Sequence, residues 1–194
     1  MKRIGVLVSG GGTNLQAVID ACESGIIRSG KIVSVLSSDE NAYALTRAAK
    51  AGIPTAVISR KNFSSADFDR AICEHMKKNE VDLIVMAGFM CIVGENLLRE
   101  FEGKIINVHP SLIPSFCGEG FYGLRVHSAA LDYGVKVTGA TVHFVTDVVD
   151  GGKIIAQKAV EVYEDDTPET LQRRVMEKAE WVILPRAIEE ICAK

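Results

Sequence analysis

The sequence predicts a single-domain α/β fold with a mostly parallel, twisted sheet of about seven strands flanked by helices. Short runs rich in β-branched residues alternate with segments of helical spacing, which is typical of βαβ units. The runs are apolar throughout instead of alternating, as expected where helices cover both faces of a sheet. Because 194 residues with 47% hydrophobic content can bury a sizeable core, residues 1–194 are expected to form one domain.

The elements are expected in the following order. The first five strands are expected at Ile4–Val8, Ile32–Leu36, Thr55–Ile58, Leu83–Met86 and Ile105–Val108. The helices between them are expected at Leu15–Glu23, Tyr43–Ala51, Ser65–Lys78 and Glu95–Phe101. A long loop, His109–Leu124, then precedes a short helix at Val126–Tyr133 and strands at Lys136–Phe144 and Lys153–Val162. Ser64 is placed to cap the third helix, and a final helix begins at Pro168, with Pro185 expected to kink or divide it.

Composition narrows the class of partner. A net charge of -3 disfavours nucleic acid, and no apolar run approaches the roughly twenty residues of a membrane span. The five cysteines are scattered and form no C-x-x-C pair, and no two histidines have H-x-x-x-H spacing. We therefore expect a cytoplasmic protein that binds small molecules, with no metal and no membrane association.

A glycine-rich turn, Ser9-Gly10-Gly11-Gly12-Thr13-Asn14-Leu15, joins the first strand to the first helix. Glycines allow close backbone approach, and a helix N-terminus offers free N–H groups, so the turn is interpreted as a phosphate site. The alternative is a plain tight turn capped by Thr13 or Asn14. A dinucleotide fingerprint is disfavoured because Leu15 occupies its third glycine position, and the G-K-[ST] of a Walker A loop is absent.

Asn107 and His109 stand two residues apart where the fifth strand ends, so both side chains point to one side. An amide donor beside an imidazole suits acyl transfer, because the pair can stabilise an oxyanion and relay a proton. Asp150 precedes two glycines, and a carboxylate there could raise the pKa of His109, although an ordinary Asp-Gly turn is the alternative. The remaining histidines are interpreted as solvated surface (His75), a helix start or cap (His127), and core or a neighbour of the site (His143).

These segments together resemble the glycinamide ribonucleotide formyltransferases, purine-synthesis enzymes that use 10-formyltetrahydrofolate and have a Rossmann-like formyltransferase fold. The resemblance is carried by Ser9–Gln16, Ala87–Met90, Asn107–Pro114 and His143–Asp147 with Asp150–Gly152. It implies glycinamide ribonucleotide and 10-formyltetrahydrofolate as small-molecule partners, the latter as co-substrate.

The resemblance also implies roles for particular residues. It implies that Asn107, His109 and Asp150 are catalytic. For the acceptor, it implies that the phosphate is held by Gly11, Gly12, Thr13 and Asn14 and that Glu180 contacts the ribose. For the folate, it implies a pocket lined by Met90, Cys91, Ile92, Val93, Asn107, Val145, Thr146 and Asp147. The family often has arginine where Cys91 stands and near Ser65, so polar folate contacts differ there. The segment Phe116–Gly123 is longer than the common loop, with Arg125 in place of a histidine, and is a candidate for covering the pocket or for association as a homodimer.

The expected mechanism is direct attack of the substrate amine on the formyl carbon, with Asn107 and His109 stabilising the tetrahedral intermediate and Asp150 assisting proton transfer. Cys91 or Cys117 as a nucleophile is the competing chemistry. Other open functions are a formyltetrahydrofolate hydrolase, another formyltransferase such as the methionyl-tRNA enzyme, and a non-catalytic phosphometabolite- or folate-binding module. Only the module would have no need of all three polar residues.

Overall fold

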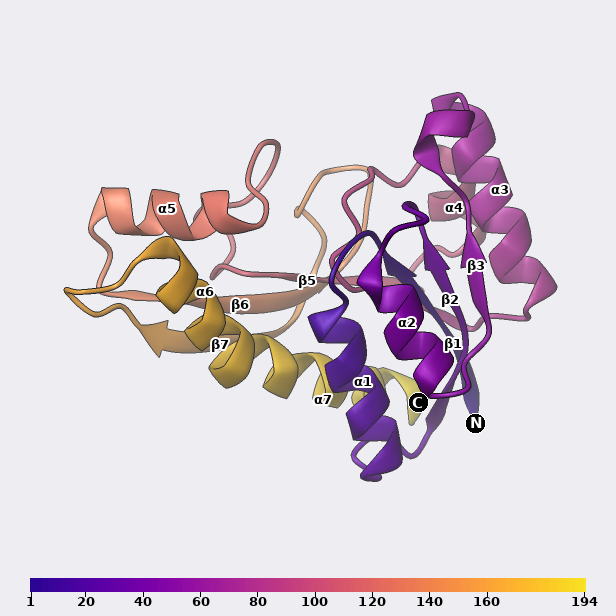
Figure 1. The fold of residues 1–194 in the computed structure, drawn as a ribbon, viewed down its shortest axis with the longest axis horizontal. Helices are drawn as coiled ribbons and strands as arrows, with labels where there is room; N and C mark the ends of the chain where they lie inside the picture. Colours follow the sequence, from indigo (N-terminus) through magenta and orange to yellow (C-terminus); the bar gives the residue numbers. More distant parts are fainter.

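The computed structural model describes all 194 residues and contains one seven-stranded sheet. In chain order the strands are β1 (Lys2–Val8), β2 (Gly30–Ser37), β3 (Thr55–Val57), β4 (Leu83–Met86), β5 (Ile105–His109), β6 (Val137–Phe144) and β7 (Ile154–Glu161). Their spatial order is β3-β2-β1-β4-β5-β6-β7, with β1 to β5 parallel and β6 and β7 antiparallel (Figure 1). The predicted fold class is confirmed.

Seven α-helices accompany the sheet: α1 (Thr13–Glu23), α2 (Tyr43–Lys50), α3 (Ser65–Lys78), α4 (Glu95–Glu100), α5 (Leu124–Tyr133), α6 (Pro168–Val175) and α7 (Trp181–Cys192). A short 3-10 turn, η1 (Arg60–Asn62), precedes α3. The Ser64 hydroxyl accepts from the Asp67 backbone N–H, so the predicted cap of α3 is confirmed. None of these helices combines the length and apolar character needed to cross a bilayer.

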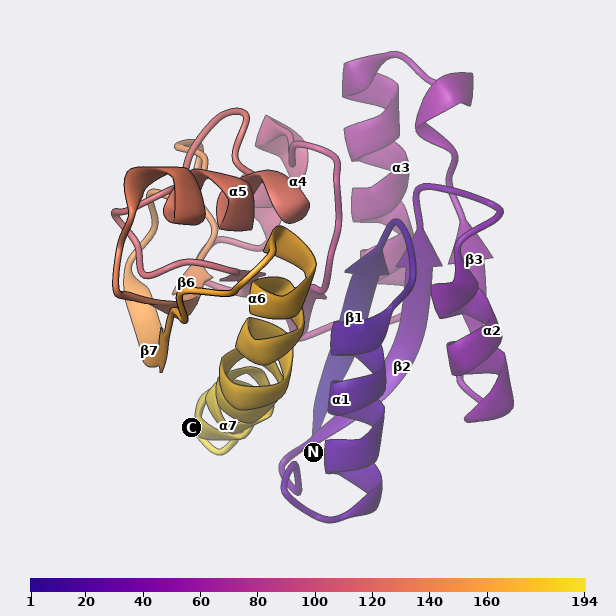
Figure 2. The same cartoon turned by 60° about the vertical axis from the view of Figure 1, so that its left-hand side comes forward.

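The helices cover the two sheet faces unequally, as Figure 2 shows. The larger core cluster joins α1, α2 and α7 to one face through residues such as Ile4, Val6 and Leu184, whereas α3 and α4 pack on the other face against Leu7 and Ile84. Successive residues of β1 therefore enter opposite cores. This two-sided burial explains why the strands are apolar throughout.

The sheet order reverses direction at β1, because the chain proceeds to β2 and β3 on one side and then returns to β4 on the other. Ligands of open α/β sheets bind outside the carboxyl ends of the strands at such a switch point. The glycine turn follows β1 and the segment Gly88–Val93 follows β4. A backbone hydrogen bond from Ser9 N–H to the Gly88 carbonyl (3.1 Å) and a hydrogen bond from Met90 N–H to the Ser9 hydroxyl (2.9 Å) hold these two segments together.

The last helical stretch differs from the prediction at its break. Pro185 lies inside α7, and the division falls before it, in a π-helical segment, η2 (Met176–Glu180), between α6 and α7. Proline removes a backbone donor and crowds the carbonyl four residues earlier, here that of Trp181, so the disturbance is displaced toward the N-terminal side. A π turn changes the direction in which the side chains along a helix point. The residues at its two ends, Met176 and Glu180, line the cavity described below.

Candidate active site

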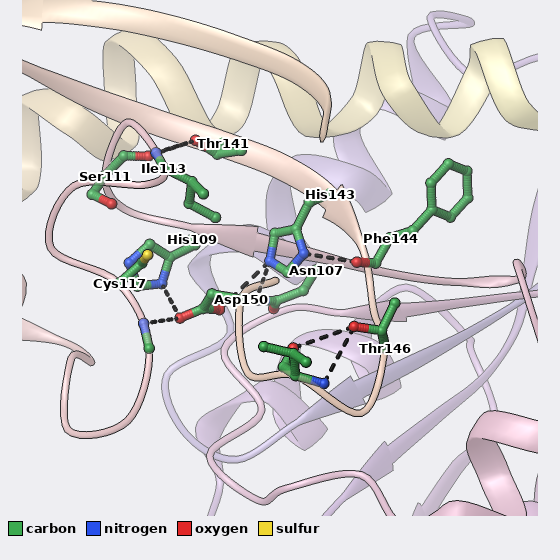
Figure 3. A network of polar contacts seen from close by, with 12 residues as sticks. Asn107, His109, Ser111, Ile113, Cys117, Thr141, His143, Phe144, Thr146 and Asp150 are labelled. Atoms are coloured by element: carbon green, nitrogen blue, oxygen red, sulfur yellow. Dashed lines mark hydrogen bonds and ion pairs between the residues drawn. The ribbon is translucent and has the colours of Figure 1, made fainter. Parts of the chain in front are cut away.

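Asn107 and His109 lie on β5 and contact the same polar cluster, as their i, i+2 spacing predicts (Figure 3). Asn107 pairs across the sheet with His143 of β6, and its Nδ2 lies 3.3 Å from His143 Nε2. His143 Nδ1 lies 2.8 Å from the Phe144 carbonyl, which can only accept, so this nitrogen carries the hydrogen and Nε2 can accept from Asn107. One of the two amide hydrogens of Asn107 is left for a ligand.

Asp150 reaches this cluster from the loop between β6 and β7. Its Oδ2 lies 3.5 Å from His109 Nδ1 and its Oδ1 lies 3.5 Å from His143 Nε2, so the carboxylate is bracketed by two histidines. The backbone at Asp150 is left-handed, with φ 55°. The loop then passes so close to β6 that an added Cβ at Gly152 would lie 1.7 Å from the Phe144 carbonyl oxygen, which explains the glycine. The position of Asp150 beside His109 separates it from an ordinary turn aspartate.

The electrostatics of the pair reflect burial and mutual attraction. Burial lowers the pKa of His109, whereas Asp150 and the Phe116 carbonyl act to raise it. The carboxylate thus acts in the expected direction, but the loss of hydration outweighs it and the pKa of His109 is lowered overall. Burial acts to raise the pKa of Asp150, but the neighbouring His143 ring, the hydrogen bond from the Gly118 N–H and the histidine charges lower it overall. Asp150 is thus an ionised neighbour of His109.

A cavity of about 650 Å³ opens beside these residues. Asn107, His109, His143 and Asp150 form part of its wall. Its other lining residues include the complete group expected from the resemblance to line a folate pocket: Met90, Cys91, Ile92, Val93, Val145, Thr146 and Asp147. Met90 and Ile92 are exposed there despite being large and apolar, which is typical of a surface that binds a flat apolar ligand.

Polar side chains from α1 and η2 form a second part of the same cavity wall. Asn14 Nδ2 donates to Glu180 Oε2 at 2.6 Å, and both residues are buried and line the cavity. Burial raises the pKa of Glu180 to about 7, while the Asn14 bond opposes that shift. The Asn14 Oδ1 has no protein partner. A buried carboxyl with an unpaired amide oxygen beside it suits recognition of hydroxyl groups.

The glycine turn adjoins this polar wall, although Gly11, Gly12 and Thr13 do not themselves line the cavity. Gly12 stands at the N-cap of α1 with φ 72°, so Thr13 and Asn14 do not cap the helix. An added Cβ at Gly12 would lie 2.6 Å from the Ala44 Cβ, which explains the glycine. Arg47 Nε donates to the Gly11 carbonyl at 2.8 Å and places a cation beside the turn. A free helix N-terminus with a nearby guanidinium is suited to an anion.

Two histidines differ from their sequence-based interpretations. His127 lies within α5, fully buried at the cavity wall, with neither ring nitrogen hydrogen-bonded; it caps nothing, since Gly123 holds the N-cap position. Burial, with the His109 charge, lowers its pKa to about 4. His75 is only half-exposed and its Nε2 lies 2.8 Å from Ser34 Oγ, so it is a structural link between α3 and β2 instead of a solvated side chain.

Cys117, one of the two cysteines considered as a nucleophile, has unsuitable surroundings. Burial and the Asp150 charge raise the pKa of its thiol, which opposes formation of the reactive thiolate. All five cysteines are free. No group of three or more histidine, cysteine or acidic side chains is arranged to hold a metal ion.

Main-chain contacts to the site were not predicted from the sequence. The Phe116 carbonyl lies 2.9 Å from His109 Nε2, and the Gly118 N–H donates to Asp150 Oδ2 at 2.9 Å. Every residue has a backbone carbonyl and nearly every residue a backbone N–H, so the sequence does not indicate which of these groups will contact the site. The length and glycine content of the loop were the only available signals.

Comparison with known proteins identifies the family. The family model described as formyl transferase matches residues 2–188. The chain belongs to the formyl transferase family. A phosphoribosylglycinamide formyltransferase of Haemophilus influenzae is 45% identical over 190 residues, covering 97% of this chain and 86% of that protein.

Two further relatives agree with that assignment. The trifunctional purine biosynthetic protein adenosine-3 of Bos taurus is 44% identical over 192 residues, which span 98% of this formyl transferase but only 18% of the bovine protein. The crystal structure of glycinamide ribonucleotide transformylase 1 from Symbiobacterium toebii superposes with a TM-score of 0.93 at 44% identity, covering 100% of this chain and 88% of that one. This formyl transferase therefore shares both fold and sequence with enzymes that carry those names.

Proposed function

We propose that this protein transfers the formyl group of 10-formyltetrahydrofolate to the amino group of glycinamide ribonucleotide, a step of purine synthesis. The observation that carries the proposal is the convergence of Asn107, His109 and Asp150 at the wall of a cavity that has both an apolar and a polar lining. The names of the relatives supply the acceptor and support the choice of reaction.

The two linings correspond to the two substrates. The apolar segments Met90–Val93 and Val145–Asp147 suit the pteridine and aromatic portions of the folate. Asn14 and Glu180 suit the ribose hydroxyls, and the N-terminus of α1 with Gly11, Gly12 and Thr13 suits the phosphate. The formyl carbon then lies where the linings meet, beside Asn107 and His109.

In the proposed reaction the neutral amine attacks the formyl carbon, forming a C–N bond while the carbonyl oxygen becomes an oxyanion. The free amide hydrogen of Asn107 and the charged form of His109, with its second proton on Nδ1, stabilise that oxyanion. Asp150, held ionised beside His109, accepts the proton that the amine loses, directly or through water. The oxyanion then collapses, the bond between the formyl carbon and the folate nitrogen breaks, and that nitrogen takes up the proton that Asp150 had accepted. The formyl group passes directly from one substrate to the other, so no covalent enzyme intermediate forms.

The relatives and the free cysteines support two wider proposals. The match of one family model to residues 2–188 supports a single catalytic domain. Five unpaired thiols suit the reducing cytoplasm, which we propose as the location.

The test is an assay of the purified protein with both substrates. We expect formylated glycinamide ribonucleotide from the wild type, and a fall in turnover of about 10²- to 10⁴-fold for His109→Ala and for Asp150→Asn. His75→Gln, on α3 and outside the cavity, is the matched control and should retain wild-type turnover. Deformylation that does not need the acceptor would support a hydrolase, and binding without turnover would support a binding module; either result overturns the proposal.

A further inference from the structure

The loop after β5 contacts both of the proposed catalytic side chains through its backbone. The segment Phe116–Gly118 offers the Phe116 carbonyl to His109 Nε2 and the Gly118 N–H to Asp150 Oδ2, each at 2.9 Å. The polarity of each contact matches its partner, since a carbonyl accepts from a ring N–H and an amide donates to a carboxylate. Figure 3 shows Cys117, the middle residue, beside His109.

The contact at Phe116 decides which nitrogen of His109 can react. A carbonyl oxygen has no hydrogen to give, so Nε2 must carry a hydrogen in both the neutral and the charged ring. The lone pair of the neutral ring is therefore on Nδ1, and the second proton of the charged ring is bound there. Nδ1 is also the nitrogen that lies 3.5 Å from Asp150.

The contact at Gly118 holds the same carboxylate oxygen that faces Nδ1. Asp150 Oδ2 accepts the Gly118 N–H at 2.9 Å while standing 3.5 Å from the ring, a spacing longer than a hydrogen bond. Nδ1 and the carboxylate thus remain close to each other without being fully engaged. Both are left available to the reacting group.

We infer that Phe116–Gly118 is a positioning segment for the reaction: the Phe116 carbonyl makes Nδ1 the reactive nitrogen of His109, and the Gly118 amide directs Asp150 toward it. The inference rests on the proposed function for its catalytic meaning. The assignment of the nitrogen itself rests on hydrogen-bond chemistry alone.

The segment is held in place by its own side-chain packing and backbone. The Phe116 ring packs edge-on against Tyr133 of α5, with centroids 6.0 Å apart, and approaches Phe121 at 6.5 Å. The backbone is left-handed at Phe116, with φ 48°, and at Gly118, with φ 90°. This conformation turns the carbonyl of one residue and the N–H of the other toward β5 and the β6–β7 loop.

The titratable groups around His109 are few, which makes its protonation a usable measurement. They are Asp150 from the β6–β7 loop, His143 from β6, His127 from α5 and the Cys117 thiol. Asp150 is the only carboxylate among them, and its negative charge favours a proton on Nδ1 of His109. Displacing Asp150 should therefore lower the pKa of His109.

The first experiment is nitrogen NMR of the His109 ring in the unliganded wild-type protein across pH. We expect the Nε2 signal to remain that of a protonated nitrogen throughout, and the Nδ1 signal to show the titration. Titration at Nε2 would overturn the inference, whether or not the protein proves to transfer formyl groups.

The second experiment compares Gly118→Ala with Gly134→Ala. Both glycines have left-handed backbones, with φ 90° and 80°, and neither Cβ would meet an atom within 4 Å, so the two changes strain the backbone alike. Gly134 ends α5 and does not line the cavity. Only Gly118 donates to Asp150.

We expect the two variants to melt at similar temperatures, but kcat of Gly118→Ala to be about 10- to 100-fold below that of Gly134→Ala, as for a misplaced catalytic group. The Nδ1 titration of Gly118→Ala should also move to lower pH. Equal kcat values and equal titrations in the two variants would overturn the positioning role. Absence of transfer by the wild type would instead contradict the proposed function and leave the NMR result to decide the nitrogen.

Discussion

At the scale of single residues, the site keeps three histidines and one carboxylate within a largely buried cluster. His109 and His143 bracket Asp150, and His127 stands behind His109 in α5. Removal from water disfavours every charge in this cluster, so the ionised Asp150 is retained only because hydrogen bonds and the ring charges offset that cost. The cluster therefore holds an ionised carboxylate beside His109, where a proton acceptor is needed for the proposed reaction.

His127 predicts an acid-sensitive fold. Its pKa of about 4 in the folded protein lies below the ordinary 6.5, so between these values the unfolded chain binds more protons. The contribution is fully present above pH 6.5 and is lost as pH falls toward 4, by on the order of 3 kcal/mol at most. We expect His127→Leu to remove this slope and to be at least as stable as wild type near neutral pH, since two unpaired ring nitrogens are replaced by apolar surface.

Denaturant unfolding at several pH values measures this effect. His75→Gln is the comparison, because His75 also has a pKa lowered by burial but is hydrogen-bonded and only half-buried. An unchanged pH slope in His127→Leu would show that other groups dominate acid sensitivity.

Glu180 predicts the opposite slope. Its folded pKa of about 7 exceeds the ordinary 4.5, so the folded state binds more protons between these values. The associated stability is present below pH 4.5 and is lost as pH rises through 7. We expect Glu180→Gln to be more stable than wild type at pH 8, because no charge is buried, yet to bind glycinamide ribonucleotide more weakly.

Thermal unfolding at pH 5 and pH 8, with calorimetric titration of the acceptor, tests both halves of that expectation. Glu177→Gln is the matched control, since Glu177 lies on the same η2 segment but is exposed. Stabilisation at pH 8 that is no greater than in the control would contradict the buried-charge explanation.

The sequence could predict those site residues whose geometry is local. Asn107 and His109 could be predicted from strand periodicity, because residues two positions apart on a strand point to the same side. Asp150 required the family resemblance, since its contact with His109 depends on how the β6–β7 loop folds back. His143 remained undecided because its partner, Asn107, lies 36 residues away and is fixed by antiparallel register. His127 was misplaced because burial by α5 packing leaves no local mark.

At the scale of elements, the start of α1 depends on one glycine. Gly12 has φ 72° and an added Cβ would also collide with Ala44, whereas Gly25, with φ 75°, has open space around it. Gly25→Ala should cost about 1–2 kcal/mol of stability from the left-handed backbone alone. Gly12→Ala should cost about 1–3 kcal/mol more from overpacking, and should weaken acceptor binding.

Chemical denaturation of the two variants isolates the steric part, because their backbone strain is nearly equal. Equal losses of stability would mean that α2 yields to the added methyl group. Unaltered acceptor affinity in Gly12→Ala would argue against a phosphate at this turn.

The apolar cavity wall depends on a contact between α3 and α4. Asp69 is buried and accepts N–H groups from Gly94 (2.8 Å), Asn96 (2.9 Å) and Leu97 (3.3 Å), at the base of the Met90–Val93 segment. An added Cβ at Gly94 would lie 2.5 Å from the Asp69 carboxyl carbon. We expect Asp69→Asn to cost about 1–3 kcal/mol and to raise KM for the folate more than KM for the acceptor.

Steady-state kinetics with each substrate varied in turn checks this expectation. Glu74→Gln, an exposed acid on the same helix, should change neither KM nor stability. An equal rise in both KM values for Asp69→Asn would indicate a general loss of structure instead of a local change in the folate wall.

The predicted elements also show where local patterns fail. The strands of the first half are continuous apolar runs, because both sheet faces are buried, and the helices between them have apolar faces. Both kinds of element were therefore placed within a few residues. The break in the last helix was expected at Pro185, where the sequence carries a helix-breaking residue, but occurs at Met176–Glu180. The π turn interrupts the regular helix at the point where Glu180 contacts Asn14. These two residues are 166 positions apart in the sequence, so no local pattern could predict their contact.

At the scale of the whole molecule, the cavity is assembled from distant parts of the chain. Its wall includes Asn14 of α1, the segment after β4, the end of β5, the β6–β7 loop and Glu180 of η2. The sheet order makes this possible, because the reversal at β1 brings the glycine turn and the segment after β4 to neighbouring positions. The alternation of elements predicts the fold class, whereas the meeting of these particular loops depends on the strand order.

A cavity built this way should link ligand binding to global stability, since no one segment can form it in the unfolded chain. Ligand at 100 times its Kd should stabilise the protein by about 2.7 kcal/mol, which for a chain of this size raises Tm by roughly 5–11 °C. We expect glycinamide ribonucleotide and a folate analogue each to raise Tm, and the two together to raise it further, because they would occupy different linings. Mutual exclusion, with the mixture matching the stronger ligand alone, would mean that both compete for one lining and would contradict the proposed arrangement of substrates around Asn107 and His109.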